Sequence, residues 1–504
     1  MRNILIFSTL TIVMAQAAFA AKPAKVPVDG RPLVFEDEPW RSEQPKAGPA
    51  HAMQTPKPQV FALANGIEVL LIERHQLPTV TMELTLQGGA IDDPADKVGL
   101  ASACMGLLTD GTQKLGQIEF NEAMADIGSS IGSYASTDQR GISLATLKQH
   151  LDATLDLWAD SILQPGMRAS EFDRNKQRRL TALHAQKGNP SSVSSRLLGS
   201  VIYGPTHAYG RFATEKSIAA YTLADCQAYV ASSIKPQGGR LFVVGDITKA
   251  EIEAKVGARL ASWTGAAAAS AVATAPTPRS GKIFLVDIPG AQQTVVTLAY
   301  PGPKRTAADF HATAIMQAIL GSGFSSRINM NIREKHGYAY GAGGGFSYNR
   351  TGSTYYTQGA VRSDVTGPSI KEILFEMTEI HKGVTPEELA REKDGAILAL
   401  PARWSTGKST LATFQNLLYF GLPLNDYDTY VQRVQAVDAE AVLAAAKAHV
   451  TPDAVQLLVV GDARTVLPQI EELRKAGTLT GELVILDVDG VVKAATPPAN
   501  PPAK

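Results

Sequence analysis

The hydrophobic and polar positions of the first third of the chain alternate with the period of β-strands. Residues 67–74 and 80–87 alternate apolar and polar side chains on either side of a Leu77-Pro78 break. An Asn65-Gly66 pair, typical of turns, precedes the first of them. Alternation with a period of two predicts half-buried strands, so this part of the chain is expected to begin a sheet.

Helical periodicity replaces the strand pattern further along. Apolar residues recur at helical spacing, and strand-like sequence interrupts them once, at residues 129–146. Strands and helices in runs, without strict alternation, indicate α+β domains with a mostly antiparallel sheet and helices packed on one face. The helical patterns cover residues 97–108, 118–127, 150–163 and 170–186.

The chain contains an internal repeat with a spacing of about 216 residues. A repeat of this length indicates a duplicated domain. Residues 242–246 (FVVGD) and 458–462 (LVVGD) are matching apolar strands that end in Gly-Asp. At nearly the same offset, Ser170 and Thr385 each precede acidic residues, the pattern of a helix N-cap. Two homologous domains are therefore predicted, together forming half of a clamshell.

Composition shifts place the domain boundaries. Residues 1–20 combine Arg2, a short apolar run and Ala-Phe-Ala, which predicts a signal peptide and a periplasmic protein. A Pro-rich extension spans 21–57, an Ala/Thr/Ser/Pro linker 265–281, and a Pro/Ala tail 491–504. The predicted domains are consequently residues 58–264 and 282–490.

Charge and cysteine content exclude several classes of protein. Lys plus Arg and Asp plus Glu number 48 each, so the formal net charge is zero, which disfavours a nucleic-acid partner. Beyond the signal peptide, no apolar stretch is long enough to predict a membrane span in the mature chain. Sequence alone does not decide whether Cys104 and Cys226 pair; their apolar helical surroundings favour two buried thiols.

Residues 99–112 (GLASACMGLLTDGT) carry a specific resemblance. They resemble the segment of insulinase/pitrilysin-type zinc peptidases in which Gly-Leu-Ala precedes an H-x-x-E-H motif. Ser102 and Gly106 stand at the two His positions, and Met105 stands at the Glu position. Ala182, on a later predicted helix, matches the third ligand of the family.

None of these four side chains suits a hydrolytic zinc. Two imidazoles at i and i+4 share a helix face and bind one ion, while the intervening Glu activates its water. Gly and Ala have no donor atom, Met is a soft thioether, and a lone Ser is a poor ligand. No two of the nine His residues lie within one helical turn. The sequence therefore predicts no cofactor in this chain, with zinc held by a partner.

The second domain keeps its part of the family pattern. Residues 286–295 resemble the Asp-x-Pro-Gly-x-x-Gln opening of the family's C-terminal domain, and residues 320–340 resemble its Gly-rich, Ser-Ser-Arg and Arg-Glu-Lys segment. The resemblance implies that Arg333 and Tyr340 hydrogen-bond the substrate backbone and stabilise the oxyanion. Arg327, in the same segment, is implied to contact substrate. Without the resemblance, an Arg at a helix end and a Tyr packed in a strand would be the simpler interpretation.

Two further motifs are interpreted as structural. Residues 406–410 (TGKST) imitate the end of a phosphate-binding loop, but Ala402 stands where that loop needs glycine, and no strand leads in. Residues 341–345 (GAGGG) lack the context of a dinucleotide-binding turn and predict close packing or a flexible strand.

Three functions compete. The favoured one is the non-catalytic, substrate-binding subunit of a periplasmic heterodimeric zinc peptidase, whose homologous partner keeps H-x-x-E-H and whose substrates are unfolded peptides. The alternative is an inactive peptide-binding or scaffold protein of the same fold. An autonomous enzyme with another nucleophile is disfavoured, because no triad or carboxylate pair is visible.

Overall fold

The computed structural model of the protein describes residues 48, 54–271, 273–274 and 281–493. The predicted signal peptide lies outside these residues, as do most of the N-terminal extension and most of the tail. All elements below belong to one compact unit, Ala50–Lys504.

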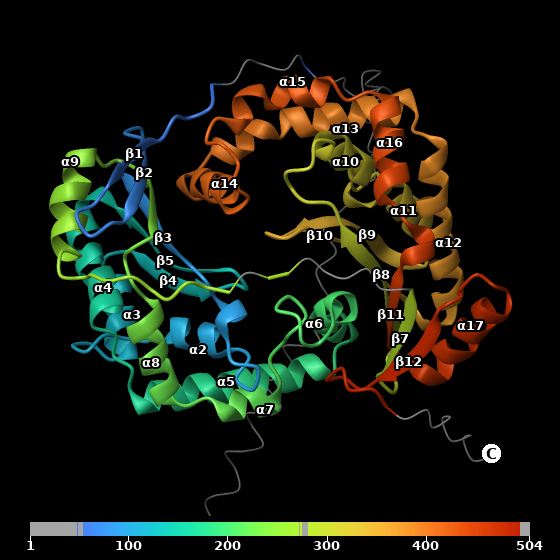
Figure 1. Ribbon diagram of the computed structural model, residues 1–504, viewed down its shortest axis with the longest axis horizontal. Helices are drawn as coiled ribbons and strands as arrows, with labels where there is room; N and C mark the ends of the chain where they lie inside the picture. The colour runs from blue at the N-terminus through green and yellow to red at the C-terminus, as the bar shows by residue number, and fades with distance from the viewer. Residues whose placement is uncertain (1–47, 49–53, 272, 275–280, 494–504) are drawn as a thin grey trace, which may run out of the picture. The chain divides into compact units, whose positions relative to one another are not determined.

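Two six-stranded sheets organise the chain, one on each side of residues 265–281 (Figure 1). The first has the order β1-β2-β6-β3-β5-β4, and the second has the order β12-β7-β11-β8-β10-β9. The first sheet contains β1 (Gln59–Ala62), β2 (Glu68–Glu73), β3 (Thr79–Gln87), β4 (Ser130–Ala135), β5 (Gln139–Leu147) and β6 (Arg240–Gly245). The second contains β7 (Lys282–Asp287), β8 (Gln293–Gly302), β9 (Ala339–Tyr348), β10 (Ser353–Arg362), β11 (Gln456–Gly461) and β12 (Glu482–Leu486).

The predicted duplication is visible in the strand order. β6 and β11, which end in the repeated Gly-Asp, occupy equivalent central places, each between a parallel and an antiparallel neighbour. Most pairings are antiparallel, as expected for the α+β class.

The helices fall close to the predicted ranges. Thr385 caps its helix through a reciprocal bond with Glu388, as its pattern predicted. Ser170 does not: it lies inside its helix, whose N-cap is Arg168. The first half contains α2 (Leu100–Leu107), α3 (Gln117–Asp126), α4 (Leu151–Leu163), α5 (Ala169–Lys187), α6 (Pro190–Tyr203), α7 (Glu215–Ala220), α8 (Leu223–Ser233) and α9 (Lys249–Glu251). The second contains α10 (Phe310–Gln317), α11 (Arg327–Asn329), α12 (Thr366–Glu379), α13 (Pro386–Leu398), α14 (Gly407–Tyr419), α15 (Tyr430–Gln435), α16 (Ala439–His449) and α17 (Ala463–Lys475).

Each sheet carries its own half's helices on one face, and a helix from the other half packs on the opposite face. α14 packs on β6 and β3, and α6 packs on β11 and β8 (Figure 1). Residues 67–74 were predicted to alternate and to form a half-buried strand, which was wrong for β2, because its central residues form a continuous apolar run that is buried on both faces. Val69 and Leu71 face the first half's core, while Leu70 and Ile72 face the side that α14 covers. Such two-sided burial is typical of central strands. The two halves thus exchange one helix each.

The two cysteines form a disulfide, so the expectation of two buried thiols was wrong. Cys104 on α2 bonds to Cys226 on α8, and both side chains are fully buried. The two helices pack against each other, which brings together residues 122 positions apart in sequence.

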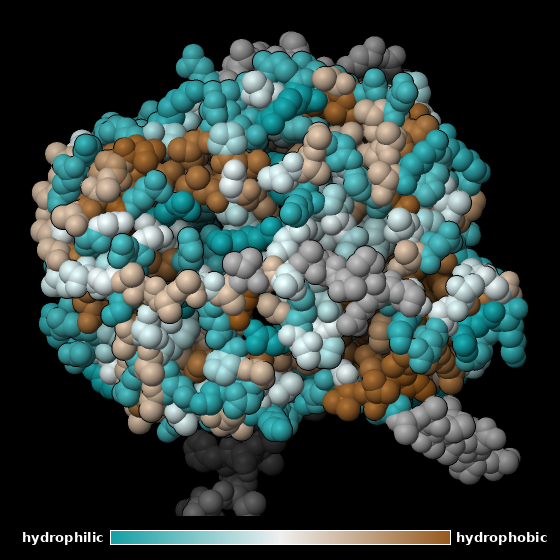
Figure 2. Space-filling model, in the orientation of Figure 1, coloured by the Kyte–Doolittle hydropathy of each residue, from teal (hydrophilic) through white to brown (hydrophobic). Residues whose placement is uncertain are grey.

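The surface shows both polar and apolar regions. Figure 2 shows hydrophilic residues over much of the visible face and apolar residues gathered near β12, where Val491 and Val492 are exposed. Among the described helices, none has the length and apolarity required to cross a membrane.

Candidate functional site

Helix α2, which carries two of the three ligand positions and the Glu position, is held firmly at its start. The Asp93 carboxylate accepts hydrogen bonds from the backbone N–H groups of Gly99 and Ala101, both at 2.8 Å. Burial raises the pKa of Asp93 to about 6 despite these bonds. The Cys104–Cys226 disulfide joins one face of α2 to α8, and another face of α2 packs against α5.

The three ligand positions and the Glu position are divided between core and surface. Met105 is fully buried and packs in the core of the first half. Ser102 and Gly106 are half-buried on the face turned to α5, and Ala182, on α5, is exposed. A Glu at position 105 would have to leave the core before it could reach a metal-bound water.

A guanidinium occupies the space beside these positions. Arg179, one turn before Ala182 on α5, donates to the Ser102 hydroxyl at 3.2 Å and to the Ser102 carbonyl at 2.7 Å. A Cβ added at Gly106 would lie 3.7 Å from Arg179 Nη2 and 3.3 Å from Asn175 Nδ2. An imidazole at position 106 would therefore meet a cation and an amide where it needs a metal ion.

The residues present do not fit the zinc ion that the resemblance implies. Their donors are absent or unsuitable, and the nearby cation would repel a second one. Over the described ranges, no group of three or more His, Cys, Asp or Glu side chains is placed to hold a metal ion. The described residues of this chain therefore do not form the zinc centre that the resemblance implies.

The structure brings Arg333 and Tyr340 together. Arg333 lies on a π-helical segment, η6 (Met330–Lys335), and Tyr340 lies at the start of β9. The guanidinium carbon is 5.2 Å from the Tyr340 ring centre and 4.9 Å from that of Phe324. Glu334 accepts a 3.2 Å contact from Arg333 Nε. Tyr340 is 90% exposed and Phe324 70% exposed, so the stacked guanidinium and the phenol are both accessible.

Arg327 has a different environment. Its guanidinium pairs in bidentate fashion with Glu388, with two contacts of 2.7 Å, and also donates to the Gly383 carbonyl. These bonds join α11 to the start of α13. Its implied contact with substrate stays a prediction.

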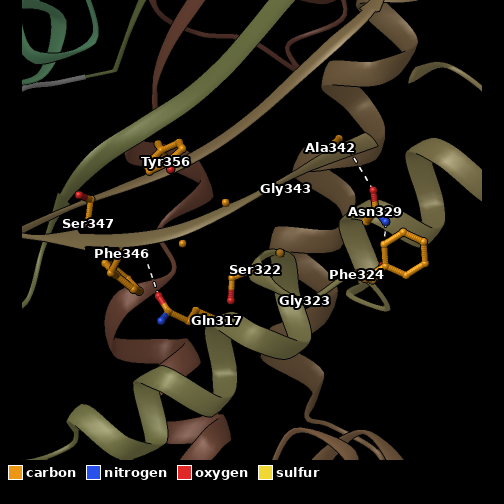
Figure 3. Close-up of a pocket in the computed structure, with 13 residues that line it drawn as sticks. Gln317, Ser322, Gly323, Phe324, Asn329, Ala342, Gly343, Phe346, Ser347 and Tyr356 are labelled. Atoms are coloured by element: carbon orange, nitrogen blue, oxygen red, sulfur yellow. Dashed lines mark hydrogen bonds between the residues drawn. The ribbon is translucent and has the colours of Figure 1, made fainter. Parts of the chain in front are cut away.

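Phe324 and Asn329 belong to this site and were missed by the sequence analysis. The buried Asn329 side chain donates to the Phe324 carbonyl at 2.7 Å and accepts from the Ala342 N–H at 3.1 Å (Figure 3). It thus ties the loop bearing Phe324 to the strand bearing Tyr340. A polar residue inside an apolar helical pattern was the only available signal.

A pocket of about 630 Å³ continues from Phe324 along β9 (Figure 3). Residues 342–345 of the glycine run form one wall, and their close packing is one of the two interpretations that the sequence left open. A Cβ at Gly343 would lie 2.2 Å from the Gly321 carbonyl, and one at Gly344 would lie 1.9 Å from the Tyr356 carbonyl. The Gln317 side chain accepts a hydrogen bond from the backbone N–H of Phe346, on the outermost strand β9, at 2.7 Å.

The phosphate-loop imitation is a helix start, as expected. The Thr406 side chain accepts from the Ser409 N–H and caps α14. Gly407 packs closely on Thr81 of the first sheet. The TGKST sequence therefore serves to begin the exchanged helix.

Comparison with known proteins identifies the relatives of this chain. Residues 68–210 match the description "Insulinase (Peptidase family M16)", and residues 220–396 match "Peptidase M16 inactive domain". A non-peptidase homolog, YmxG, of Helicobacter pylori is 24% identical over 391 residues, covering 76% of this chain and 89% of that protein. A probable mitochondrial-processing peptidase subunit beta of Arabidopsis thaliana is 20% identical over 84% of this chain and 82% of that protein.

Solved structures agree with this assignment. The peptidase M16 inactive domain from Pseudomonas fluorescens superposes with a TM-score of 0.74 and 25% identity, over 80% of this chain and 98% of that one. The periplasmic protease PqqL from Escherichia coli has the same fold over 90% of this chain and 51% of its own, with a TM-score of 0.69 and 16% identity.

Proposed function

Because the chain belongs to the peptidase M16 (insulinase) family and is an inactive member of it, we propose that it is the substrate-binding subunit of a heterodimeric zinc peptidase. A homologous partner would hold zinc through H-x-x-E-H, and this chain would supply Arg333 and Tyr340 to the partner's active site. The substrates would be unfolded peptides.

The exposed pairing of Arg333 with Tyr340 carries the proposal. The rings of Phe324 and Tyr340 and the Glu334 carboxylate hold the Arg333 cation in place, and a guanidinium offers fixed donors for a peptide carbonyl. A 90% exposed Tyr contributes little to folding, so its place beside that cation is better explained by contact with a ligand.

We place the complex in the periplasm. The predicted signal peptide and the Cys104–Cys226 disulfide support this location, since disulfides persist in oxidising compartments. The alternative function, an inactive peptide-binding or scaffold protein, needs neither Arg333 nor Tyr340 at the surface.

Reconstitution with an exported zinc-bearing relative from the same organism tests the proposal. Arg333→Ala and Tyr340→Phe should each lower kcat by about a hundredfold, the usual effect of losing one oxyanion donor. Zinc content and assembly should not change. Arg362→Ala provides the control, because Arg362 is an exposed arginine of the same half, paired with Asp364. Turnover at the wild-type rate by both site variants would favour the scaffold alternative.

A further inference from the structure

The Arg179 guanidinium is held by three hydrogen bonds, all to uncharged acceptors. Besides its two bonds to Ser102, Nε donates to Asn175 Oδ1 at 2.7 Å. A guanidinium has five N–H donors in a fixed plane, so two remain. Because Nε and the edge shared by Nη1 and Nη2 already donate, these two point to opposite sides of the group. The three bonds fix that plane between α2 and α5.

This cation has no carboxylate partner. Within the part of the chain that the structure describes, no Asp or Glu oxygen forms an ion pair with Arg179. Asp110, whose charge acts on it, contacts Arg178 at 3.5 Å and accepts from Asn175 at 3.3 Å. Burial lowers the pKa of Arg179, and the charge of Arg178 lowers it further. A partly buried cation without a counter-ion attracts an anion from solution.

We propose that the Arg179 guanidinium has taken the place of the metal ion on this face and that it binds a carboxylate, such as the free C-terminus of a peptide. Each open N–H donor can bind one oxygen of a carboxylate, and the positive charge of the guanidinium strengthens that hydrogen bond. The neighbouring strand β4 is the outermost strand of its sheet, and its Ser133 hydroxyl bonds to the Met105 carbonyl of α2 at 2.7 Å. The site thus lies next to a sheet edge at which an extended chain can end.

The binding site requires no zinc-bearing partner, so its test is separate from that of the proposed function. The isolated chain is titrated with a fluorescent unstructured peptide that has no acidic residues, either with a free C-terminus or amidated. A third, amidated peptide with one internal Glu distinguishes a side-chain carboxylate from a C-terminal one. Fluorescence anisotropy gives the Kd of each.

The free acid should bind about ten- to a hundredfold more tightly than the amide, the range for a hydrogen bond to a charged group. Arg179→Gln should remove this difference, whereas the control Arg178→Gln should keep it. Arg179→Lys, which retains the charge and loses the planar fork, should retain part of it. Equal binding of acid and amide by the wild type, or no binding of either, overturns the proposal. If the amidated peptide with an internal Glu binds more tightly than the free acid, the ligand is an acidic side chain and the proposed C-terminal carboxylate is wrong.

Rebuilding the metal site gives a second test. The three ligand positions and the Glu position are restored together in a variant carrying S102H, M105E, G106H and A182E. With Arg179 present, this variant should bind well under one zinc per chain, and adding Arg179→Gln should raise zinc binding, read by elemental analysis after dialysis. One tightly bound zinc in the presence of Arg179 would show that the guanidinium does not occupy the metal's place. Absence of zinc from both variants would show that Arg179 is not what excludes it.

Discussion

Removal of the disulfide should destabilise the protein strongly. We consider the double variant Cys104→Ala/Cys226→Ala, which leaves no unpaired thiol. The bond closes a loop of 122 residues. In the chain-entropy treatment, a loop of that length corresponds to about 5 kcal/mol of stabilisation, and measured values for native disulfides are about 2–5 kcal/mol. Both side chains are fully buried, so the lost sulfur contacts add to this effect.

Equilibrium unfolding in guanidinium chloride, followed by circular dichroism, measures the difference from the oxidised wild type. Wild-type protein refolded in a reductant serves as the control, because it lacks the bond and keeps both sulfurs. Thiol titration of denatured protein should find no free thiol in the oxidised form. Two free thiols per chain, or an unfolding free energy within about 0.5 kcal/mol of the variant's, would refute the reasoning.

Three further outcomes are expected. Phe414→Ala, which empties a fully buried position of the exchanged helix α14, should cost about 3–5 kcal/mol in the unfolding free energy. Gly344→Ala should cost about 1–3 kcal/mol because its Cβ meets a strand carbonyl, whereas Gly395→Ala, with open space in α13, should be neutral or slightly stabilising in the same denaturation assay. Burial and the charge of Arg433 lower the pKa of His311 to about 4. Since the unfolded state binds the proton first, stability should fall as pH decreases from about 6.5 toward 4, and His311→Asn should flatten that part of the pH profile.

The periodicity of the sequence predicted most elements and the duplication, because each depends on local pattern. The range 118–127 became α3, and 170–186 became α5, each within a residue or two. The alternation at 80–87 became β3. The repeated Gly-Asp marked two strands that proved equivalent in the sheets.

Tertiary relationships were not predictable in the same way. An apolar helix pattern such as that of α14 shows that one face is buried, but not which sheet covers it. The pairing of Cys104 with Cys226 depends on α2 packing on α8, which no local signal specifies. Comparison of the ligand positions showed which side chains had been lost, but not that Arg179, three residues before Ala182 on the same helix face, fills the space.

The packing of α6 and α14 on the opposite halves joins the two halves by contacts besides the linker. Residues 265–281 separate two sheets in sequence, but the face of β2 and β6 that carries Leu70 and Phe242 is covered by a helix from beyond that segment. The described part of the segment is also anchored, since the Ser270 hydroxyl donates to the Asp92 carboxylate at 2.7 Å. Burial of a large apolar face between halves favours a single cooperative unit over two independent domains. The orientation of Arg333 and Tyr340 relative to the first half is therefore set by packing between the halves and not by the linker.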